Sequence, residues 1–144
     1  MVVIEDQFVV SLLTLGNWLS RVGGRLMAPL GLSQQESVIL IDAAGRGPVS
    51  QKELRSNLLL ERSNVSKAVL HLTSMDLLTS EPSPTDGRAV LVRATPAGDQ
   101  LAERCMRVYQ EWNRRWLDGT DPHRLADAIP LLDELRLRDP EVGK

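Results

Sequence analysis

The sequence contains very little cysteine, histidine or aromatic side chain. Cys105 is the single cysteine among 144 residues, which excludes an internal disulfide and a cysteine-rich zinc site. His71 and His123 are too few and too far apart to suggest a metal site, so neither a metal nor a cofactor is expected. With three tryptophans, one tyrosine and one phenylalanine, aliphatic side chains must fill most of the core.

Long apolar runs and catalytic motifs are also missing. No apolar run approaches the ~18 residues that span a bilayer. Glu5 and Asp6 stand where a signal peptide would carry positive charge, so we expect a cytoplasmic protein without membrane association. Gly23-Gly24 and the pair Gly45 and Gly47 do not form a phosphate-binding loop. No nucleophile with a partner base is evident either. The sequence therefore argues against an enzyme.

The charge is nearly balanced in total but unevenly distributed. The formal net charge is −2, from 17 basic and 19 acidic residues. Residues 46–95 hold 7 basic and 5 acidic residues, whereas the rest of the chain holds 10 basic and 14 acidic residues. A mildly basic middle between acidic flanks permits nucleic-acid binding that depends strongly on salt.

Two capping boxes mark helix starts in the first half of the chain. In each, a serine hydroxyl and a glutamate carboxylate can satisfy free backbone N–H groups. Ser33 with Glu36 predicts a helix that ends at residues 45–47, and Ser50 with Glu53 predicts a short helix that ends near Asn57. Before them, leucine and valine recur every three or four positions and predict an amphipathic helix over residues 4–27.

Residues 51–98 form the most informative part of the chain. The short helix is followed by a turn at 58–60 and by a helix from residue 61 or 62 to 75. The apolar stripe of that helix is predicted to face the core and comprises Val65, Val69, Leu72 and Met75. Strands at 78–81 and 89–93 then enclose a tip of Asp86-Gly87-Arg88. A helix-turn-helix followed at once by a small basic hairpin is an arrangement suited to double-stranded DNA.

The end of the chain predicts two more helices. Thr95-Pro96 is an N-cap followed by proline at the first helical position, and it begins a long helix to residue 116 or 117. Asp121-Pro122 repeats the signal for a last helix, which Pro130 is expected to kink or split. The terminal helices have more apolar surface than the small middle lobe can cover. We therefore expect a homodimer.

In this order and spacing, several short motifs resemble the MarR family of bacterial transcriptional regulators. The similarity covers most of the chain and is strongest over residues 32–98. Its matching segments are Leu32-Ser33, Gly47-Pro48-Val49-Ser50, Glu53-Leu54, Arg62-Ser63-Asn64-Val65-Ser66-Lys67, Asp86 with Arg88, and Thr95-Pro96-Ala97-Gly98.

The resemblance implies a particular organisation. The fold class is mainly α with a small β-hairpin wing. A single domain spans residues 1–144, with a winged helix-turn-helix lobe at 32–98 and helical dimerisation regions at 1–30 and 95–140. The chain departs from the family pattern at four places: Leu59 and Asp76 replace glycines, Glu61 replaces a better N-cap, and Gly87 replaces one of two wing arginines.

The predicted DNA contacts lie on three elements. The solvent face of the helix at 62–75 is expected to read base edges in the major groove with Ser63, Asn64, Ser66 and Lys67. Phosphate contacts are expected from the starts of the two helices, namely Ser50, Gln51, Lys52 and Arg62, with Ser50 serving mainly as a cap. In the wing, the resemblance implies that Arg88 enters the minor groove, while Asp86 holds Arg88 or the tip and Arg93 adds a phosphate contact. An ordinary polar helix face and a surface ion pair at the wing are the plainer alternatives.

A small-molecule effector is a further expectation. Many such regulators bind aromatic or phenolic acids between the DNA-binding lobe and the dimer helices. The residues that offer rings and cations for such a ligand are Trp18, Arg21, Arg25, Trp112 and Trp116. Simple packing at a dimer seam is the alternative role of these tryptophans. Cys105 lies in the long helix after the wing, and a buried structural thiol is favoured there over a redox sensor.

We therefore expect a sequence-specific transcriptional regulator, with repression as the expected mode, that binds a pseudo-palindromic operator with half-sites about one helical turn apart. Ligand binding would favour a spacing of the two recognition helices that no longer fits the DNA. Two alternatives stay open. One is a winged-helix module, or anti-regulator, that binds protein instead of DNA. The other is a DNA binder without any ligand.

Overall fold

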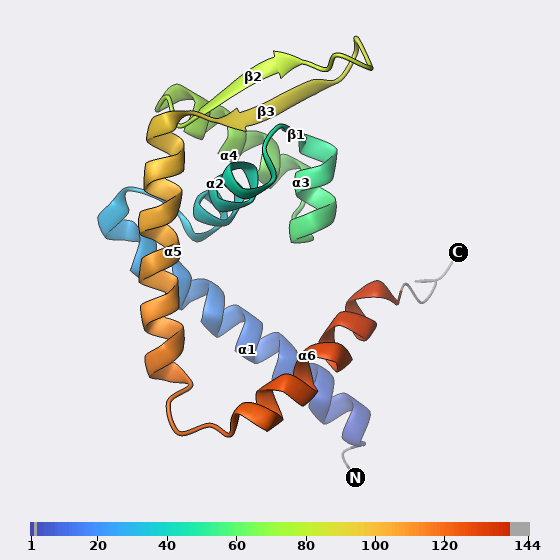
Figure 1. Ribbon diagram of the computed structural model, residues 1–144. Helices are drawn as coiled ribbons and strands as arrows, with labels where there is room; N and C mark the ends of the chain where they lie inside the picture. Colours follow the sequence, from blue (N-terminus) through green and yellow to red (C-terminus); the bar gives the residue numbers. More distant parts are fainter. Residues whose placement is uncertain (2, 139–144) are drawn as a thin grey trace. The chain divides into compact units, whose positions relative to one another are not determined.

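A computed structural model describes Met1 and residues 3–138. The helices are α1 (Ile4–Met27), a short 3₁₀ helix η1 (Ala28–Leu30), α2 (Gln34–Arg46), α3 (Gln51–Leu58), α4 (Arg62–Ser74), α5 (Pro96–Trp116) and α6 (Pro122–Leu137). The strands are β1 (Val49–Ser50), β2 (Leu78–Pro82) and β3 (Val90–Ala94). The predicted fold class, mainly helical with a β-hairpin wing, is confirmed (Figure 1).

The described residues form two compact units, which are divided between Gln110 and Glu111. The first holds α1–α4, the sheet and most of α5. The second holds the end of α5 and α6. Residue 2 and residues 139–140 of the predicted dimerisation regions lie outside the described residues. No helix in the described part of the chain is long and apolar enough to cross a membrane.

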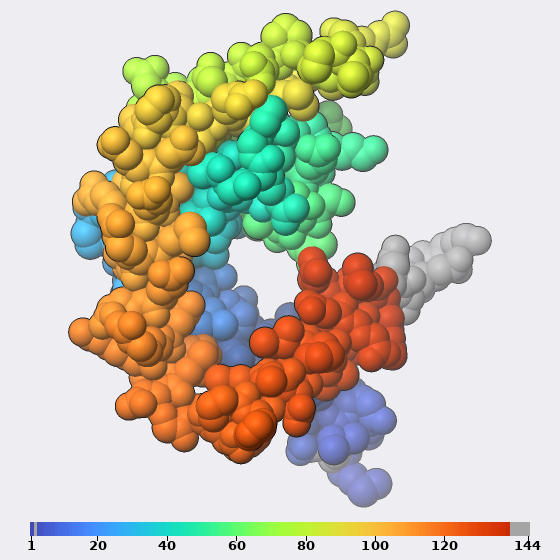
Figure 2. All heavy atoms as spheres, viewed as in Figure 1, coloured from blue at the N-terminus to red at the C-terminus, as the bar shows by residue number. Residues whose placement is uncertain are grey.

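The wing is part of a three-stranded antiparallel sheet with the order β1-β3-β2. Val49 pairs with Val92, and Leu78 pairs with Ala94. The sequence pattern predicted the two strands of the β2–β3 hairpin but no strand at Val49–Ser50. Two residues are too few for a periodic signal, so the third strand appears only once its partner β3 is in place. In Figure 2 the hairpin projects beyond the helices of its own unit.

Aliphatic side chains from α2, α3, α4 and the sheet form the core beneath the wing. The fully buried members include Ile39, Leu40, Leu54, Val65 and Leu72. Each buried aliphatic side chain of this size contributes about 1.5–3 kcal/mol relative to an exposed one. The core fixes α3 and α4 against α2 and leaves their other faces to solvent.

The predicted helix starts are confirmed by their hydrogen bonds. Both capping boxes are complete, at Ser33 and at Ser50. The Thr95 hydroxyl accepts a hydrogen bond from the Gly98 N–H at 3.0 Å, and the Asp121 carboxylate accepts one from the His123 N–H at 2.9 Å. The hydrogen-bond partners in each cap lie only two or three residues apart, so these caps can form without any tertiary contact.

The structure corrects one detail of the sequence prediction and excludes one alternative of another. Met75 was expected in the core, but it is the C-cap of α4 and 36% exposed, because the helical stripe ends with Ser74. Pro130 was expected to kink or split the last helix; it does not split it, since α6 continues through it. By contrast, Val65, Val69 and Leu72 face the core as predicted.

Both positions where glycine was expected have a left-handed backbone. Leu59, the C-cap of α3, has φ 53° and ψ 43°, and Asp76 has φ 57°. Glycine adopts this conformation without steric cost, whereas a leucine is strained there. Leu59 and Asp76 thus differ from the family's glycines in their side chains, while the backbone keeps the left-handed turn.

Candidate nucleic-acid interface

The helix-turn-helix consists of α3, a turn and α4. Leu54 of α3 and Val65 of α4 are fully buried and hold the two helices together. On the surface, the Ser66 hydroxyl of α4 donates a hydrogen bond to the side-chain oxygen of Gln51, the first residue of α3, at 3.1 Å. A hydrogen bond thus joins two of the predicted DNA contacts, Gln51 and Ser66.

The first turn of α3 is organised around Ser50. Its hydroxyl accepts a hydrogen bond from the Glu53 N–H at 3.1 Å, and its own N–H donates to the Glu53 carboxylate at 3.0 Å. This agrees with the expected capping role of Ser50. Lys52 is exposed next to it, so the helix start presents a cation beside free backbone N–H groups, the arrangement that binds phosphate.

The predicted base-reading residues of α4 do not all lie on one face. Ser63 and Lys67 are exposed and lie four residues apart, opposite the buried stripe. Arg62 is exposed at the first position of the helix. Asn64 is half-buried, and both Asn64 and Lys67 border a surface hollow of about 280 Å³ beside α2. In the sequence these polar residues are equivalent candidates for base readout. In the helix, Asn64 points away from the outward stripe, which is the exposed side of α4 that carries Ser63 and Lys67.

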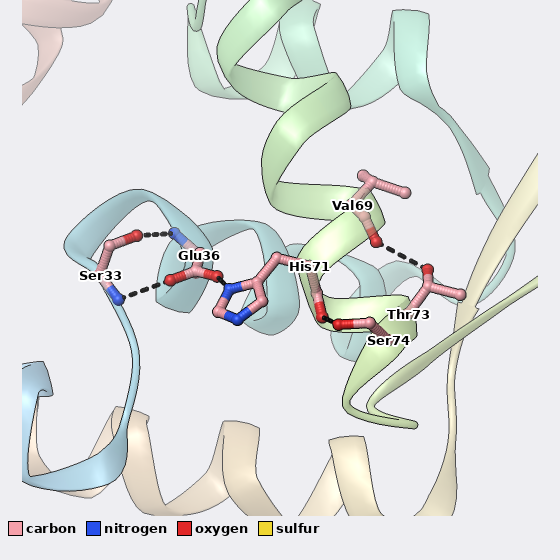
Figure 3. A network of polar contacts seen from close by, with 6 residues as sticks. All are labelled: Ser33, Glu36, Val69, His71, Thr73 and Ser74. Atoms are coloured by element: carbon pink, nitrogen blue, oxygen red, sulfur yellow. Dashed lines mark hydrogen bonds and ion pairs between the residues drawn. The ribbon is translucent and has the colours of Figure 1, made fainter.

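A polar network behind α4 was not expected from the sequence. The Glu36 carboxylate of α2 accepts a hydrogen bond from the Ser33 N–H at 2.9 Å and also contacts the His71 ring of α4 (Figure 3). Burial alone would raise the pKa of Glu36, but the hydrogen bonds from Ser33 and His71 outweigh it and lower the pKa below its ordinary value. The network fixes α4 against the start of α2. No local signal reveals a pair separated by 35 residues.

Asp86 shapes the tip of the wing. Its carboxylate accepts a hydrogen bond from the Arg88 N–H at 3.1 Å, and its carbonyl accepts one from the Ala89 N–H at 3.0 Å. The expected role of Asp86 in holding the tip is confirmed. Arg88 is exposed at this tip, and the hydrogen bond from its backbone N–H to Asp86 fixes its backbone.

Arg93 differs from Arg88 in its surroundings. Its guanidinium donates to the Glu81 carboxylate across the hairpin at 3.2 Å, and both side chains are about half exposed. Such a surface pair contributes at most about 1 kcal/mol. Arg93 stays a predicted phosphate contact, but Glu81 offsets its charge in the free protein.

The predicted effector residues fall into two groups. Trp18, Arg21 and Arg25 lie on one face of α1 and border a hollow of about 680 Å³. Trp112 and Trp116 stack on each other in the second unit, with ring centroids 5.1 Å apart. The α1 group thus combines an indole with two guanidinium groups, which suits an aromatic acid.

Cys105 is fully buried in α5, as the structural interpretation predicts. Burial raises the pKa of the Cys105 thiol, and the neighbouring Arg104 only partly opposes this effect. A buried thiol with a raised pKa reacts slowly. One turn later, the Tyr109 hydroxyl lies 2.6 Å from the hydroxyl of Ser37, which itself donates to the Gln34 carbonyl at 2.6 Å. Tyr109 is therefore the donor, and it ties α5 to α2.

Residues 32–98 match the protein family described as a winged helix DNA-binding domain. The two helices, the turn and the wing thus define a winged helix-turn-helix protein. The HTH-type transcriptional repressor IacR of Pseudomonas putida is 30% identical over 109 residues, which cover 71% of this chain and 65% of IacR. The chain therefore spans less than two thirds of that relative's length.

Solved structures share the fold over nearly the whole chain. Bordetella bronchiseptica BpsR, studied for regulation of its DNA binding by 6-hydroxynicotinic acid, has a TM-score of 0.84 at 19% identity and covers 96% of this chain and 99% of its own. A variant of Escherichia coli MarR complexed with operator DNA has a TM-score of 0.73 at 19% identity and covers 93% of this chain and 99% of its own. The chain thus shares the fold of these two regulators, MarR and BpsR, over nearly its whole length.

Proposed function

We propose that this protein is a sequence-specific transcriptional regulator that binds double-stranded DNA through α4 and the wing. One observation carries the proposal: the exposed side of α4, with Ser63 and Lys67, is held rigidly by a buried stripe on its other side and by the Ser66–Gln51 bond. A rigid helix with polar side chains facing outward is what base readout in the major groove needs. Arg88 at the ordered wing tip supplies the cation for the minor groove.

The proposed binding form is a homodimer on a pseudo-palindromic operator. Large apolar side chains are exposed on both terminal helices; those on α1 include Phe8, Val9, Val10, Leu13 and Leu15, and those on α6 include Ile129, Leu131 and Leu132. A second copy of the chain would cover these surfaces. Its two-fold symmetry would place two recognition helices about one turn of DNA apart.

Repression and effector control are further parts of the proposal. The similarity to a repressor supports repression, and the hollow beside Trp18, Arg21 and Arg25 supports a small aromatic acid as the effector. A guanidinium group would pair with the carboxylate of the acid while Trp18 covers its ring. Binding would then shift the dimer toward a spacing of recognition helices that does not fit the operator.

A salt titration of DNA binding tests the proposal. Fluorescence anisotropy would compare a duplex from the region upstream of the protein's own coding sequence with a scrambled duplex of equal length. We expect tighter binding to the native duplex that survives moderate salt, because base contacts do not depend on counterion release. Equal, weak binding to both duplexes that vanishes with salt would lead us first to other upstream regions. The same result there would contradict sequence-specific readout.

Charge-matched variants locate the interface. Lys67→Ala and Arg88→Ala should each weaken binding about tenfold, within the range of one lost DNA contact. Arg107→Ala removes the same charge from an exposed position on α5 and should change affinity only slightly. If all three variants behave alike, α4 and the wing are not the DNA-binding surface, and a module that binds protein becomes the better interpretation.

A further inference from the structure

Leu70 is the large apolar side chain at the middle of the outward face of α4. It is 72% exposed, whereas Leu72 two residues later is fully buried. A single leucine on a protein surface needs no explanation, but this one lies on the helix that is expected to enter the major groove. Its side chain has no hydrogen-bonding group, so the polar pattern that predicts base readers on this helix does not include it.

The helical geometry places Leu70 among the predicted readers. Residues at intervals of three and four share one side of an α-helix. Ser63, Lys67 and Leu70 follow that spacing, and all three are exposed. The buried Val65, Val69 and Leu72 lie on the opposite side. Leu70 therefore points in the same direction as Ser63 and Lys67.

The hydroxyl groups on either side of Leu70 already donate their protons within the protein. Ser66, one turn before Leu70, donates to Gln51 at 3.1 Å. Ser74, one turn after it, donates to the His71 carbonyl at 2.6 Å (Figure 3). A base edge opposite Leu70 thus meets an apolar side chain flanked by hydroxyls without a free proton. Among the four base pairs, the major-groove group that matches an apolar side chain is the C5 methyl of thymine.

We propose that Leu70 selects thymine in the operator by packing against its C5 methyl group. This inference rests on the proposed DNA binding through α4. Lys67, one turn earlier on the same face, would then supply a donor for an acceptor on the same or the adjacent base. Removing one buried methyl group should weaken binding about threefold to fourfold in each half-site, and about tenfold when both half-sites are changed.

Thymine-to-deoxyuridine substitution tests the inference because it removes only the methyl group. The operator would be selected from random duplexes with the full-length wild-type chain. Each thymine would then be replaced by deoxyuridine in both half-sites, and the Kd would be measured for wild type and Leu70→Ala at one salt concentration. We expect one symmetric thymine pair whose demethylation weakens wild type about tenfold and leaves Leu70→Ala unchanged.

A matched control separates this effect from general loss of apolar surface. Leu59→Ala shortens a leucine that is 67% exposed in the turn before α4, and it should keep the full dependence on the methyl group. Equal melting temperatures of wild type and Leu70→Ala would show that folding is intact.

The possible failures are distinguishable. If wild type selects an operator but every thymine effect persists in Leu70→Ala, the role of Leu70 is refuted and the DNA-binding proposal stands. The same holds if the operator has no thymine whose methyl group matters. If no sequence is enriched at all, the proposed function and this inference fail together.

Discussion

Gly98 offers the sharpest test of how the first turn of α5 meets the DNA-binding lobe. A Cβ atom added at Gly98 would lie 2.0 Å from the carbonyl oxygen of Leu77 and 3.4 Å from a methyl carbon of Leu40. The Leu77 oxygen accepts a hydrogen bond from the Thr95 N–H at 3.0 Å. Gly98→Ala must therefore displace backbone that is already hydrogen-bonded, since no flexible side chain is available to move.

The sign of the effect distinguishes this contact from ordinary helix propensity. Alanine in place of glycine inside an unobstructed helix raises the free energy of unfolding by about 0.5–1 kcal/mol. Forcing an extra carbon into a packed contact lowers it by about 1–3 kcal/mol. Because the obstacle at Gly98 is backbone, we expect the upper end of that range and a net loss of about 2 kcal/mol.

Gly45→Ala is the matched control. Gly45 lies in the last turn of α2, and a Cβ there would meet nothing within 4 Å. This variant should be more stable than wild type by about 0.5–1 kcal/mol. Urea unfolding followed by circular dichroism would measure both, at one protein concentration because dimer formation would change the apparent stability. The reasoning is refuted if Gly98→Ala is as stable as wild type while Gly45→Ala is stabilised.

Three shorter predictions concern the network, the wing and the thiol. The pKa of Glu36 is lowered in the folded protein, so the ionised carboxylate stabilises the fold above the ordinary glutamate pKa, and this contribution is lost as the pH falls through the folded-state pKa. The free energy of unfolding should therefore fall less steeply with acid in Glu36→Gln than in wild type. Parallel curves for the two proteins would contradict this prediction. Asp86→Ala removes the acceptor for the Arg88 N–H and should weaken DNA binding about twofold to tenfold; a larger loss than that of Arg88→Ala would argue against a purely ordering role. Cys105 should resist thiol reagents in the folded protein and react once urea unfolds it, whereas rapid reaction without denaturant would disprove its burial.

The sequence was sufficient wherever the signal is local. The capping boxes at Ser33 and Ser50, and the N-cap at Thr95, involve partners three residues away, and all three are present in the structure. The hydrophobic stripe of α4 was equally readable because helical periodicity repeats within a few turns. These local signals also led to the family resemblance, which the comparisons confirm.

The sequence was insufficient wherever two distant residues must meet. Glu36 and His71 are 35 residues apart, and Gln51 and Ser66 are 15 apart, so neither pair leaves a pattern in the chain. The count of charged residues likewise does not show that Glu81 pairs with Arg93 across the hairpin. The predicted DNA contacts and effector residues stay predictions, because the free protein shows where these side chains lie and not what they bind.

The same limit explains why α4 needs its structure before its readout can be argued. In the sequence, Ser63, Asn64 and Lys67 are equivalent polar residues on one helix. In the structure, Asn64 is half-buried, whereas Ser63 and Lys67 are exposed opposite the buried stripe, with Lys67 also bordering the hollow beside α2. Base readout depends on which donors remain available after the protein has used its own. The hydroxyls of Ser66 and Ser74 donate within the protein, so the exposed side of α4 has fewer hydrogen-bond donors for DNA than its sequence suggests. The exposed apolar side chain of Leu70 is therefore part of the surface with which α4 can recognise a base.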